Sequence, residues 1–219
     1  MRIKNMCMCF VLILTLCCCV FSYDYYFALA NSSDEVVDPV GFQYQGESGF
    51  YTNLSDVIQT INLIKEYNQI DNFIIHVFGS KSTYHVSQPS VCYSANISLV
   101  GIHSNDPLAI NNGRPKVVYN VGTNNNYDYM ILASDAKVVA KGIDFYRGDL
   151  PTETNVGILN AAHCSEVSIS ECSFDNVSAL YQADNSSELL NRVIKIYNCI
   201  LKNDRLSWDI DISQDKRWC

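Results

Sequence analysis

Three segments of the chain repeat one apolar spacing, and this repeat constrains the fold more than any other feature. Apolar residues lie at positions 0, +2, +5 and +7 of each segment: Val138, Ala140, Ile143, Phe145; Val167, Ile169, Cys172, Phe174; and Ile194, Ile196, Cys199, Leu201. The segments start 29 and 27 residues apart. A short alternating unit repeated at this period is typical of a coil whose turns stack on one another.

The step of three residues inside each segment predicts a bend. Positions 0 and +2 share one face of a strand, and +5 and +7 share a face of a second strand, so the chain between them must absorb one residue. Gly142, Glu171 and Asn198 occupy this bend, where Gly and Asn suit a left-handed backbone better than Glu does. The segment 97–102 fits the same pattern with Gly101 at its bend. We therefore expect an all-β fold, a single-stranded right-handed parallel β-helix.

The remaining elements of such a coil are also visible. Leu54, Val57, Ile58, Ile61 and Ile64 follow helical spacing and predict a short N-terminal helix. This helix would cover the open end of the coil, which otherwise exposes apolar side chains and unpaired strand edges. Further strands are expected at Phe73–Phe78, Ile97–Ile102 and Lys116–Val121, and a third face at Tyr129–Ala133, Val156–Ala161 and Ala179–Ala183.

The N-terminus predicts entry into the secretory pathway. Arg2 and Lys4 precede an uncharged stretch from Met6 to Phe21, which at 16 residues is shorter than the ~20 that a spanning helix needs. We expect a signal peptide over residues 1–22, with cleavage after Ala30 as an alternative and an uncleaved membrane anchor as the competing interpretation. We expect residues 23–45 to form a loose leader and residues 46–206 the β-helix. The tail 207–219 either caps the stack or marks a domain that continues beyond this sequence.

Composition agrees with an extracellular protein and narrows its partners. The chain has ten cysteines, of which Cys92, Cys164, Cys172, Cys199 and Cys219 follow the predicted signal. Sequons for N-glycosylation occur at Asn31, Asn53, Asn96, Asn176 and Asn185. Without the signal, 13 basic side chains remain against 23 acidic ones, a net charge of −10. This charge argues against nucleic acid or anionic lipid as the partner, and against tight, purely electrostatic binding of a polyanion such as de-esterified pectin.

Several motifs, in the same order, resemble the pectinesterase family across residues 46–204. They are Ser48-Gly49-Phe50-Tyr51 with Leu54-Ser55-Asp56-Val57-Ile58, Ile74-Ile75-His76-Val77, Ser82-Thr83-Tyr84, Ile97-Ser98-Leu99-Val100-Gly101, Ala140-Lys141-Gly142-Ile143-Asp144-Phe145, Cys172-Ser173-Phe174-Asp175 and Tyr197-Asn198-Cys199-Ile200. The resemblance implies a secreted β-helix and, in active members, removal of methyl esters by two aspartates. The residues themselves indicate no cofactor and no metal, since the sequence has no zinc-like histidine spacing and no calcium loop of alternating acids.

The catalytic motifs of that family are not matched. Where the resemblance implies an oxyanion-binding glutamine the chain has Gly157, and where it implies the acid aspartate the chain has Ala179. Neither side chain can hold an oxyanion or donate a proton. Asp204 and Asp209 lie near the expected nucleophile and are the remaining catalytic candidates, with solvated loop acids as the alternative.

Other candidate site residues come from the third face of the coil and from the cysteines. Candidate carbohydrate-binding residues are Tyr129, Asn155, Asn160, Tyr181 and Gln182, and tyrosines that could contribute to a sugar-stacking face are Tyr119, Tyr127, Tyr129, Tyr146 and Tyr181. Cys172 and Cys199 share position +5 on successive turns, about 4.8 Å apart, which is within the range of a disulfide. The resemblance also implies this pairing, and an unbonded stack of thiols is the alternative. The four histidines lack the spacing of a metal site.

Three functions follow from these observations. The leading expectation is a secreted pectinesterase-like β-helix without catalytic aspartates that binds polysaccharide or an extracellular surface partner. The alternatives are an active carbohydrate esterase whose catalytic turn is displaced or missing, and a structural or adhesive surface protein.

Overall fold

The computed structural model describes residues 24–37, 41–65, 72–86, 89–93, 95–120, 129–134, 136–148, 157–181 and 193–202. Within these residues the chain forms strands β1 to β15, one α-helix and two short 3-10 helices, Ser33–Glu35 and Asn111–Gly113. The strands pair in parallel throughout the three sheets. The all-β class expected from the alternating pattern is therefore confirmed.

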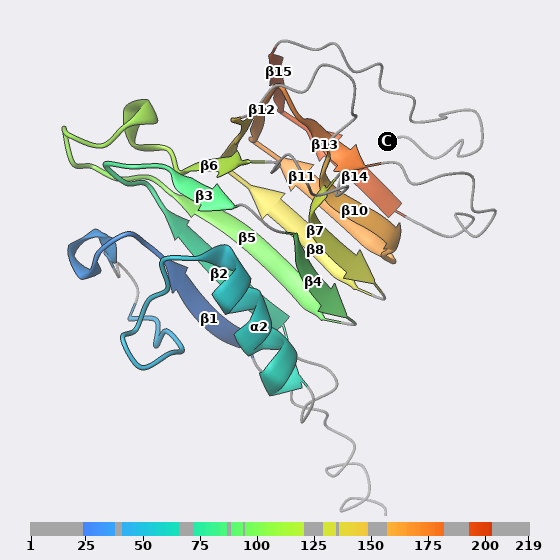
Figure 1. Ribbon diagram of the computed structural model, residues 1–219, viewed down its shortest axis with the longest axis horizontal. Coiled ribbons are helices and arrows are strands. Elements are labelled where there is room, and N and C mark those ends of the chain that lie inside the picture. Colours follow the sequence, from blue (N-terminus) through green and yellow to red (C-terminus); the bar gives the residue numbers. More distant parts are fainter. Residues whose placement is uncertain are drawn as a thin grey trace, which may run out of the picture.

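Each sheet contains strands that recur along the chain at regular intervals. Sheet A has the order β1 (Asp24–Leu29), β2 (Asn72–Phe78), β5 (Asn96–Ile102), β8 (Lys137–Lys141), β11 (Glu166–Ser170) and β14 (Val193–Tyr197). Sheet B has β3 (Tyr84–Val86), β6 (Lys116–Tyr119), β9 (Asp144–Arg147), β12 (Ser173–Asp175) and β15 (Ile200–Lys202). Sheet C has β4 (Ser90–Tyr93), β7 (Tyr129–Ser134), β10 (Gly157–His163) and β13 (Ser178–Tyr181). From β2 onward the chain visits sheets A, B and C in turn (Figure 1).

The repeated apolar positions stack on one another, as the sequence predicted. Val167 pairs in register with Val138 on one side and with Ile194 on the other. In sheet B, Phe174 pairs with Phe145 and with Leu201. The rings of Phe145 and Phe174 are both buried and lie parallel, with centroids 5.5 Å apart. The side chain of Leu201 lies outside the described part of the structure.

The three bends between sheets A and B have the left-handed backbone that the spacing predicted. The φ angles are 70° at Gly142, 54° at Glu171 and 54° at Asn198. The prediction of a bend at Gly101 is wrong. β5 continues through this residue, which pairs with Val77 and has no left-handed φ.

The single α-helix of the described residues, α2 (Leu54–Lys65), lies at the N-terminal end of the sheets (Figure 1). Its buried residues are Leu54, Val57, Ile58 and Ile61, and they join the apolar core between the sheets. Asn62 Nδ2 donates a hydrogen bond to the carbonyl oxygen of Val91 in β4, at a distance of 2.7 Å. The helix predicted from the spacing at 54–64 is thus confirmed, and its apolar side packs on the core.

The expectation of a loose leader over residues 23–45 is wrong. β1 pairs with β2 along its whole length, from Asp24 opposite Asn72 to Leu29 opposite Val77. Phe27 and Leu29 alternate along β1 and are fully buried, so this segment supplies apolar side chains to the core. Sheet A therefore begins before residue 46. The predicted signal peptide and the tail 207–219 lie outside the described residues.

Candidate functional site

A pocket lies on the outer side of β1, where two loops cover the strand. Ala28 and Ala30 alternate with the core-facing Phe27 and Leu29, and their small side chains form a second, outer apolar cluster with Phe78. Two isolated bridges, Tyr26 with Tyr44 and Leu29 with Tyr51, hold the second loop parallel to β1. Small residues on this face leave room that the loop side chains fill only in part.

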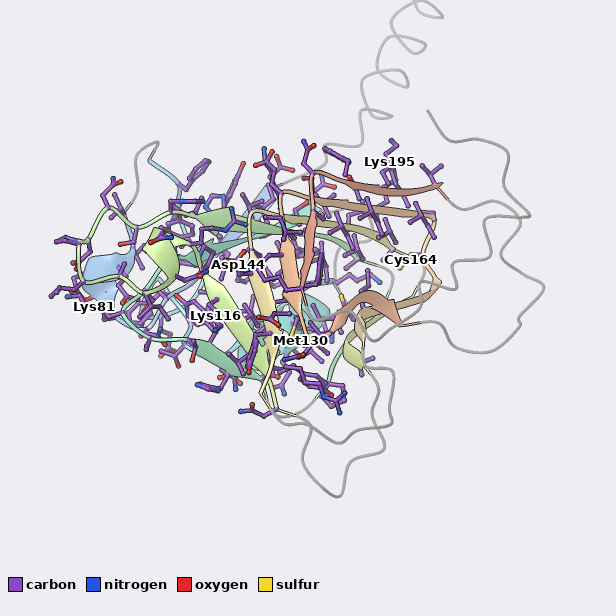
Figure 2. The ribbon with its side chains drawn as sticks, turned by 90° about the horizontal axis from the view of Figure 1, so that it is seen from above. Lys81, Lys116, Met130, Asp144, Cys164 and Lys195 are labelled. Atoms are coloured by element: carbon purple, nitrogen blue, oxygen red, sulfur yellow. The ribbon has the colours of Figure 1, made fainter. Side chains whose placement is uncertain are left out.

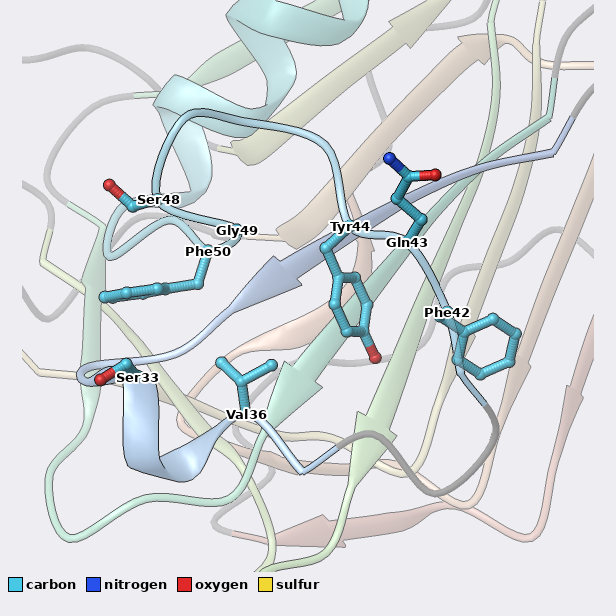
Figure 3. Close-up of a pocket in the computed structure, with 8 residues that line it drawn as sticks. All are labelled: Ser33, Val36, Phe42, Gln43, Tyr44, Ser48, Gly49 and Phe50. Atoms are coloured by element: carbon cyan, nitrogen blue, oxygen red, sulfur yellow. The ribbon is translucent and has the colours of Figure 1, made fainter.

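The pocket has a volume of about 430 Å³ and is lined by Ser33, Val36, Phe42, Gln43, Tyr44, Ser48, Gly49 and Phe50. Figure 3 shows Phe50, Val36 and Tyr44 facing one space. Phe42 stacks on Tyr26, with ring centroids 4.4 Å apart, and this contact fixes the right-hand wall. All eight lining residues are uncharged.

Tyr44 is held in place by an aromatic and polar contact with β2. Its hydroxyl and Nδ1 of His76 share a hydrogen bond of 2.9 Å. The Tyr44 ring also meets the rings of His76 and Phe78 edge-on, at centroid distances of 5.7 and 6.1 Å. His76 is only 7% exposed, so β2 provides a rigid support for this wall of the pocket.

The chemistry of the lining favours binding rather than catalysis. Half-buried aromatic rings offer apolar faces, while the amide of Gln43 and the hydroxyls of Ser33 and Ser48 offer hydrogen bonds at the rim. General acid–base catalysis requires a titratable group within hydrogen-bond reach of the reacting atom. The carboxylates of the neighbouring loop, such as Glu35, are not among the lining side chains: Glu35 accepts hydrogen bonds from the Asn31 backbone N–H and the Ser80 hydroxyl.

A polar cluster away from the pocket joins three segments that are distant in sequence, and its role is structural. Arg114 Nε donates to Asp144 Oδ1 at 2.9 Å, and Arg114 Nη2 donates to the carbonyl oxygen of Glu171 at 2.5 Å. The other oxygen of Asp144 accepts a hydrogen bond from Asn111 Nδ2. Asp144 lies next to Lys116 on the outer side of sheet B (Figure 2). Because both of its oxygens are engaged, Asp144 is not presented as a nucleophile.

The structure brings only some of the predicted site residues together. Asn160 of β10 is the register partner of Tyr181 of β13, so these two positions are adjacent on sheet C. Tyr129 pairs instead with Gly157, three residues earlier on β10. The side chains of Tyr129, Asn160 and Tyr181 lie outside the described part of the structure. The candidate residues Asn155, Gln182, Asp204 and Asp209 lie wholly outside it.

Gly157 and Ala179 both belong to strands of sheet C. Gly157 lies opposite Ser178, so Ala179 follows one residue later on the neighbouring strand. Gly157 and Ala179 therefore lie close together on β10 and β13, and neither side chain can hold an oxyanion or donate a proton.

The expected tyrosine face is not assembled by the described tyrosines. Tyr119 is 1% exposed and belongs to the core, so its assignment to a sugar-stacking face is wrong. Tyr146 is half-buried on sheet B, and its ring is covered by Lys116 Nζ at 4.5 Å from the centroid. Tyr127 lies outside the described residues.

Cys172 and Cys199 are free thiols in the structure, as is Cys92. The expected disulfide between Cys172 and Cys199 is therefore not formed, although Ser173 and Ile200, which follow them, pair in register. The Cys199 thiol contacts the carbonyl oxygens of Tyr197 and Ile169, at 3.4 and 3.8 Å. Burial raises the pKa of the Cys172 thiol to about 11 and that of Cys92 to about 12.

Among the described residues, no group of three or more His, Cys, Asp or Glu side chains is arranged to hold a metal ion. A search of the same part of the chain finds no helix that is long and apolar enough to cross a membrane.

Sequence reasoning missed the pocket because five of its eight lining residues fall in the segment 23–45, which was assigned to a loose leader, and the other three, Ser48 to Phe50, were assigned to the start of the β-helix. The available signal was the pair of small residues Ala28 and Ala30 on one face of an aromatic strand, followed by Phe42, Tyr44 and Phe50 in a loop. Comparison with known proteins adds no constraint: no family model, curated protein or solved structure matches this chain.

Proposed function

We propose that this chain is a secreted, pectinesterase-like right-handed parallel β-helix that binds carbohydrate without hydrolysing it. The observation that carries this proposal is the pocket of residues 33–50, which combines aromatic walls with uncharged hydrogen-bonding groups and has no acid in its lining.

The fold topology supports the β-helix part of the proposal. The chain visits three parallel sheets in the same order on successive turns, with left-handed bends at equivalent positions. Crossover connections between parallel strands are right-handed in nearly all proteins, because of the twist of the strands, and this favours a right-handed coil.

The N-terminal sequence supports secretion. The predicted signal ends at Ser22, two residues before the start of β1 at Asp24. Cleavage after Ala30 would remove β1 together with the buried side chains of Phe27 and Leu29. Cleavage after residue 22 is therefore the alternative that leaves sheet A and the pocket intact.

The pocket chemistry supports carbohydrate as the ligand class. Pyranose rings present C–H groups on their faces and hydroxyl groups around their edges. Aromatic walls such as Phe50 and Tyr44 match the faces, while Gln43, Ser33 and Ser48 match the hydroxyl groups. Gly157 and Ala179 at the matched catalytic positions support binding without turnover.

Affinity electrophoresis of the native protein in gels containing soluble neutral or methyl-esterified polysaccharides tests the binding. We expect retardation by at least one polymer, and loss of that retardation in Gln43→Ala and Phe50→Ala. Gln43 is exposed, so its variant tests the pocket without removing core packing. Leu108→Ala is the matched control, because Leu108 is 70% exposed and is not a pocket residue.

A parallel assay of methanol release separates binding from the esterase alternative. We expect no release from methylated pectin above background. Turnover that Asp204→Asn or Asp209→Asn abolishes would replace this proposal with an active esterase. If no polysaccharide of the panel causes retardation and none is turned over, a structural or adhesive role remains as the candidate function.

A further inference from the structure

We infer that Asn53 carries an N-linked glycan in the folded protein, and that the sequons at Asn31 and Asn96 do not. The inference rests on the secretory route proposed above, because only chains that enter this pathway meet the transferring enzyme. It selects among sequons that are equivalent in sequence, since each reads Asn-x-Ser.

Asn53 is presented to solvent at the start of α2. Its side chain is exposed, and its Oδ1 accepts a hydrogen bond of 3.0 Å from the backbone N–H of Ser55. This is the arrangement of an N-cap, in which a side-chain oxygen satisfies an amide of the first helical turn. Among the described residues, Nδ2 of Asn53 has no hydrogen-bond partner.

The chemistry of the linkage fits this geometry. An N-linked sugar forms a bond to Nδ2 in place of one amide hydrogen and leaves Oδ1 unchanged. At Asn53 the oxygen performs the structural role and the nitrogen is the atom that becomes modified. A glycan at this position therefore keeps the cap of α2 and extends into solvent.

Asn96 has the opposite arrangement, because it belongs to a polar ladder across four strands of sheet A. Asn72 Nδ2 donates to Asp24 Oδ1 at 2.9 Å, and Asn96 Nδ2 donates to Asn72 Oδ1 at 3.3 Å. Asn96 Oδ1 in turn accepts from the backbone N–H of Lys137 at 3.2 Å. Both polar atoms of Asn96 lie between neighbouring strands, and such strands are about 4.8 Å apart. A sugar on Nδ2 would have to displace the ladder.

Asn31 is similarly engaged, in a network around a buried serine. Its Nδ2 donates to Ser80 Oγ at 2.8 Å, and Ser80 is 2% exposed. Ser80 Oγ donates to Glu35 Oε1 at 2.7 Å, and the Asn31 backbone N–H donates to Glu35 Oε2 at 2.9 Å. A sugar on Nδ2 of Asn31 would separate its amide from the hydroxyl that holds the carboxylate of Glu35.

Glycan transfer precedes folding, so each of these sequons can receive a glycan in the unfolded chain. Only those modified chains that still fold then leave the cell. Chains modified at Asn53 keep all of the contacts described above. At Asn96 or Asn31 the sugar must be accommodated beside the hydrogen bond that Nδ2 donates, with only one amide hydrogen left to make it, which destabilises the native state. The secreted, folded protein is therefore the population to examine.

Peptide mapping of the full chain, secreted from a eukaryotic host behind a heterologous signal peptide, tests the inference. Enzymatic removal of the glycan in heavy-oxygen water converts each modified Asn to a labelled Asp that mass spectrometry locates. We expect label at Asn53 and unmodified peptides for Asn31 and Asn96. Asn53→Asp is the matched variant, because aspartate keeps the capping oxygen but cannot be glycosylated. It should lose the mass of one glycan.

An unmodified Asn53 in secreted, folded protein would overturn the inference, and so would a glycan on Asn31 or Asn96. The heterologous signal makes this result independent of the predicted native signal. A parallel expression with the native N-terminus tests the proposed secretion. If the protein is not secreted, that proposal is contradicted, while the inference that Asn53 is the acceptor is unaffected.

Discussion

Gly101 of β5 and Gly142, which follows β8, approach so closely that a Cβ atom on Gly101 would lie 2.2 Å from the carbonyl oxygen of Gly142. The Pro115 ring lies 3.0 Å from the same Cβ position. The obstructing oxygen belongs to the backbone of the neighbouring turn, so a side chain at residue 101 can be accommodated only by moving that turn.

We therefore predict that Gly101→Ala lowers the free energy of unfolding by about 3 kcal/mol or more, as for severe overpacking. Gly142→Ala is the control, because its Cβ would meet its nearest neighbour at an ordinary 3.6 Å. That variant has only the cost of a left-handed φ of 70°, roughly 1–2 kcal/mol. Chemical denaturation measures both values. A loss of stability in Gly101→Ala no larger than in Gly142→Ala would contradict the close contact.

Glu171 is the least suited of the three residues at the left-handed bends. Its φ is 54°, and its carboxylate forms only an exposed ion pair of 3.4 Å with Lys141. We predict that Glu171→Gly raises the free energy of unfolding by about 1 kcal/mol, because glycine adopts this conformation without steric cost.

Glu171→Ala separates the backbone effect from the loss of the carboxylate, because alanine removes the ion pair and keeps the Cβ. It should leave stability within about 0.5 kcal/mol of the original chain, since exposed ion pairs contribute little. Thermal denaturation of the three proteins gives the comparison. Equal melting temperatures for the Gly and Ala variants would show that the bend is not strained.

The part of the fold that repeats was predictable from sequence, because each repeat has the same apolar spacing and so requires the same pair of strands joined by a bend. Val138, Val167 and Ile194 recur at one position of a strand, and stacked parallel strands bring all three to one side of sheet A, where the two valines are buried and Ile194 is partly buried. The bends followed from the odd step between the two strands of each unit. The prediction failed at Gly101 because a glycine can either adopt a left-handed bend or allow two backbones to approach closely, and the sequence does not distinguish these two roles.

The candidate site was not predictable in the same way. β1 occurs once, has no counterpart in the repeat and joins sheet A only through its pairing with β2, across more than forty intervening residues. The pocket depends on where two loops lie over Ala28 and Ala30, and this placement is a tertiary property. Charge and composition lead only to an expectation about the class of partner, whereas the location of the pocket required the folded chain.

Asp144 should contribute to stability more than its position near the surface suggests. Its side chain is 15% exposed, that of Arg114 is 28% exposed, and the pair is joined at 2.9 Å. We predict that Asp144→Asn destabilises the protein by about 1–3 kcal/mol, because it leaves the guanidinium without its charged acceptor. Urea denaturation at low and high salt measures the effect.

Asp106→Asn is the matched control for this cluster. Asp106 pairs with Lys81 at 3.0 Å, and both side chains are exposed. Its removal should not change the denaturation midpoint beyond experimental error, since solvent screens such pairs. Similar shifts in the two variants would mean that Arg114 and Asp144 act as an ordinary surface pair.

The thiols of Cys172 and Cys199 should differ in their reactivity toward iodoacetamide. Thiolate is the reactive form, and burial raises the pKa of Cys172 to about 11, so only on the order of 0.1% of this thiol is ionised at pH 8. Cys199 is half-buried and more accessible. We predict that Cys199 is alkylated first in the native protein, and that the rate at Cys172 rises about tenfold per pH unit below its pKa.

In urea the two sites should react at similar rates, because unfolding removes the difference in burial. Mass spectrometry of peptides from timed samples follows both residues, with the buried Cys92 as a second slow site. A cross-linked Cys172–Cys199 peptide in unreduced native protein would show instead that the two turns are joined covalently, and neither thiol would then be alkylated without reduction.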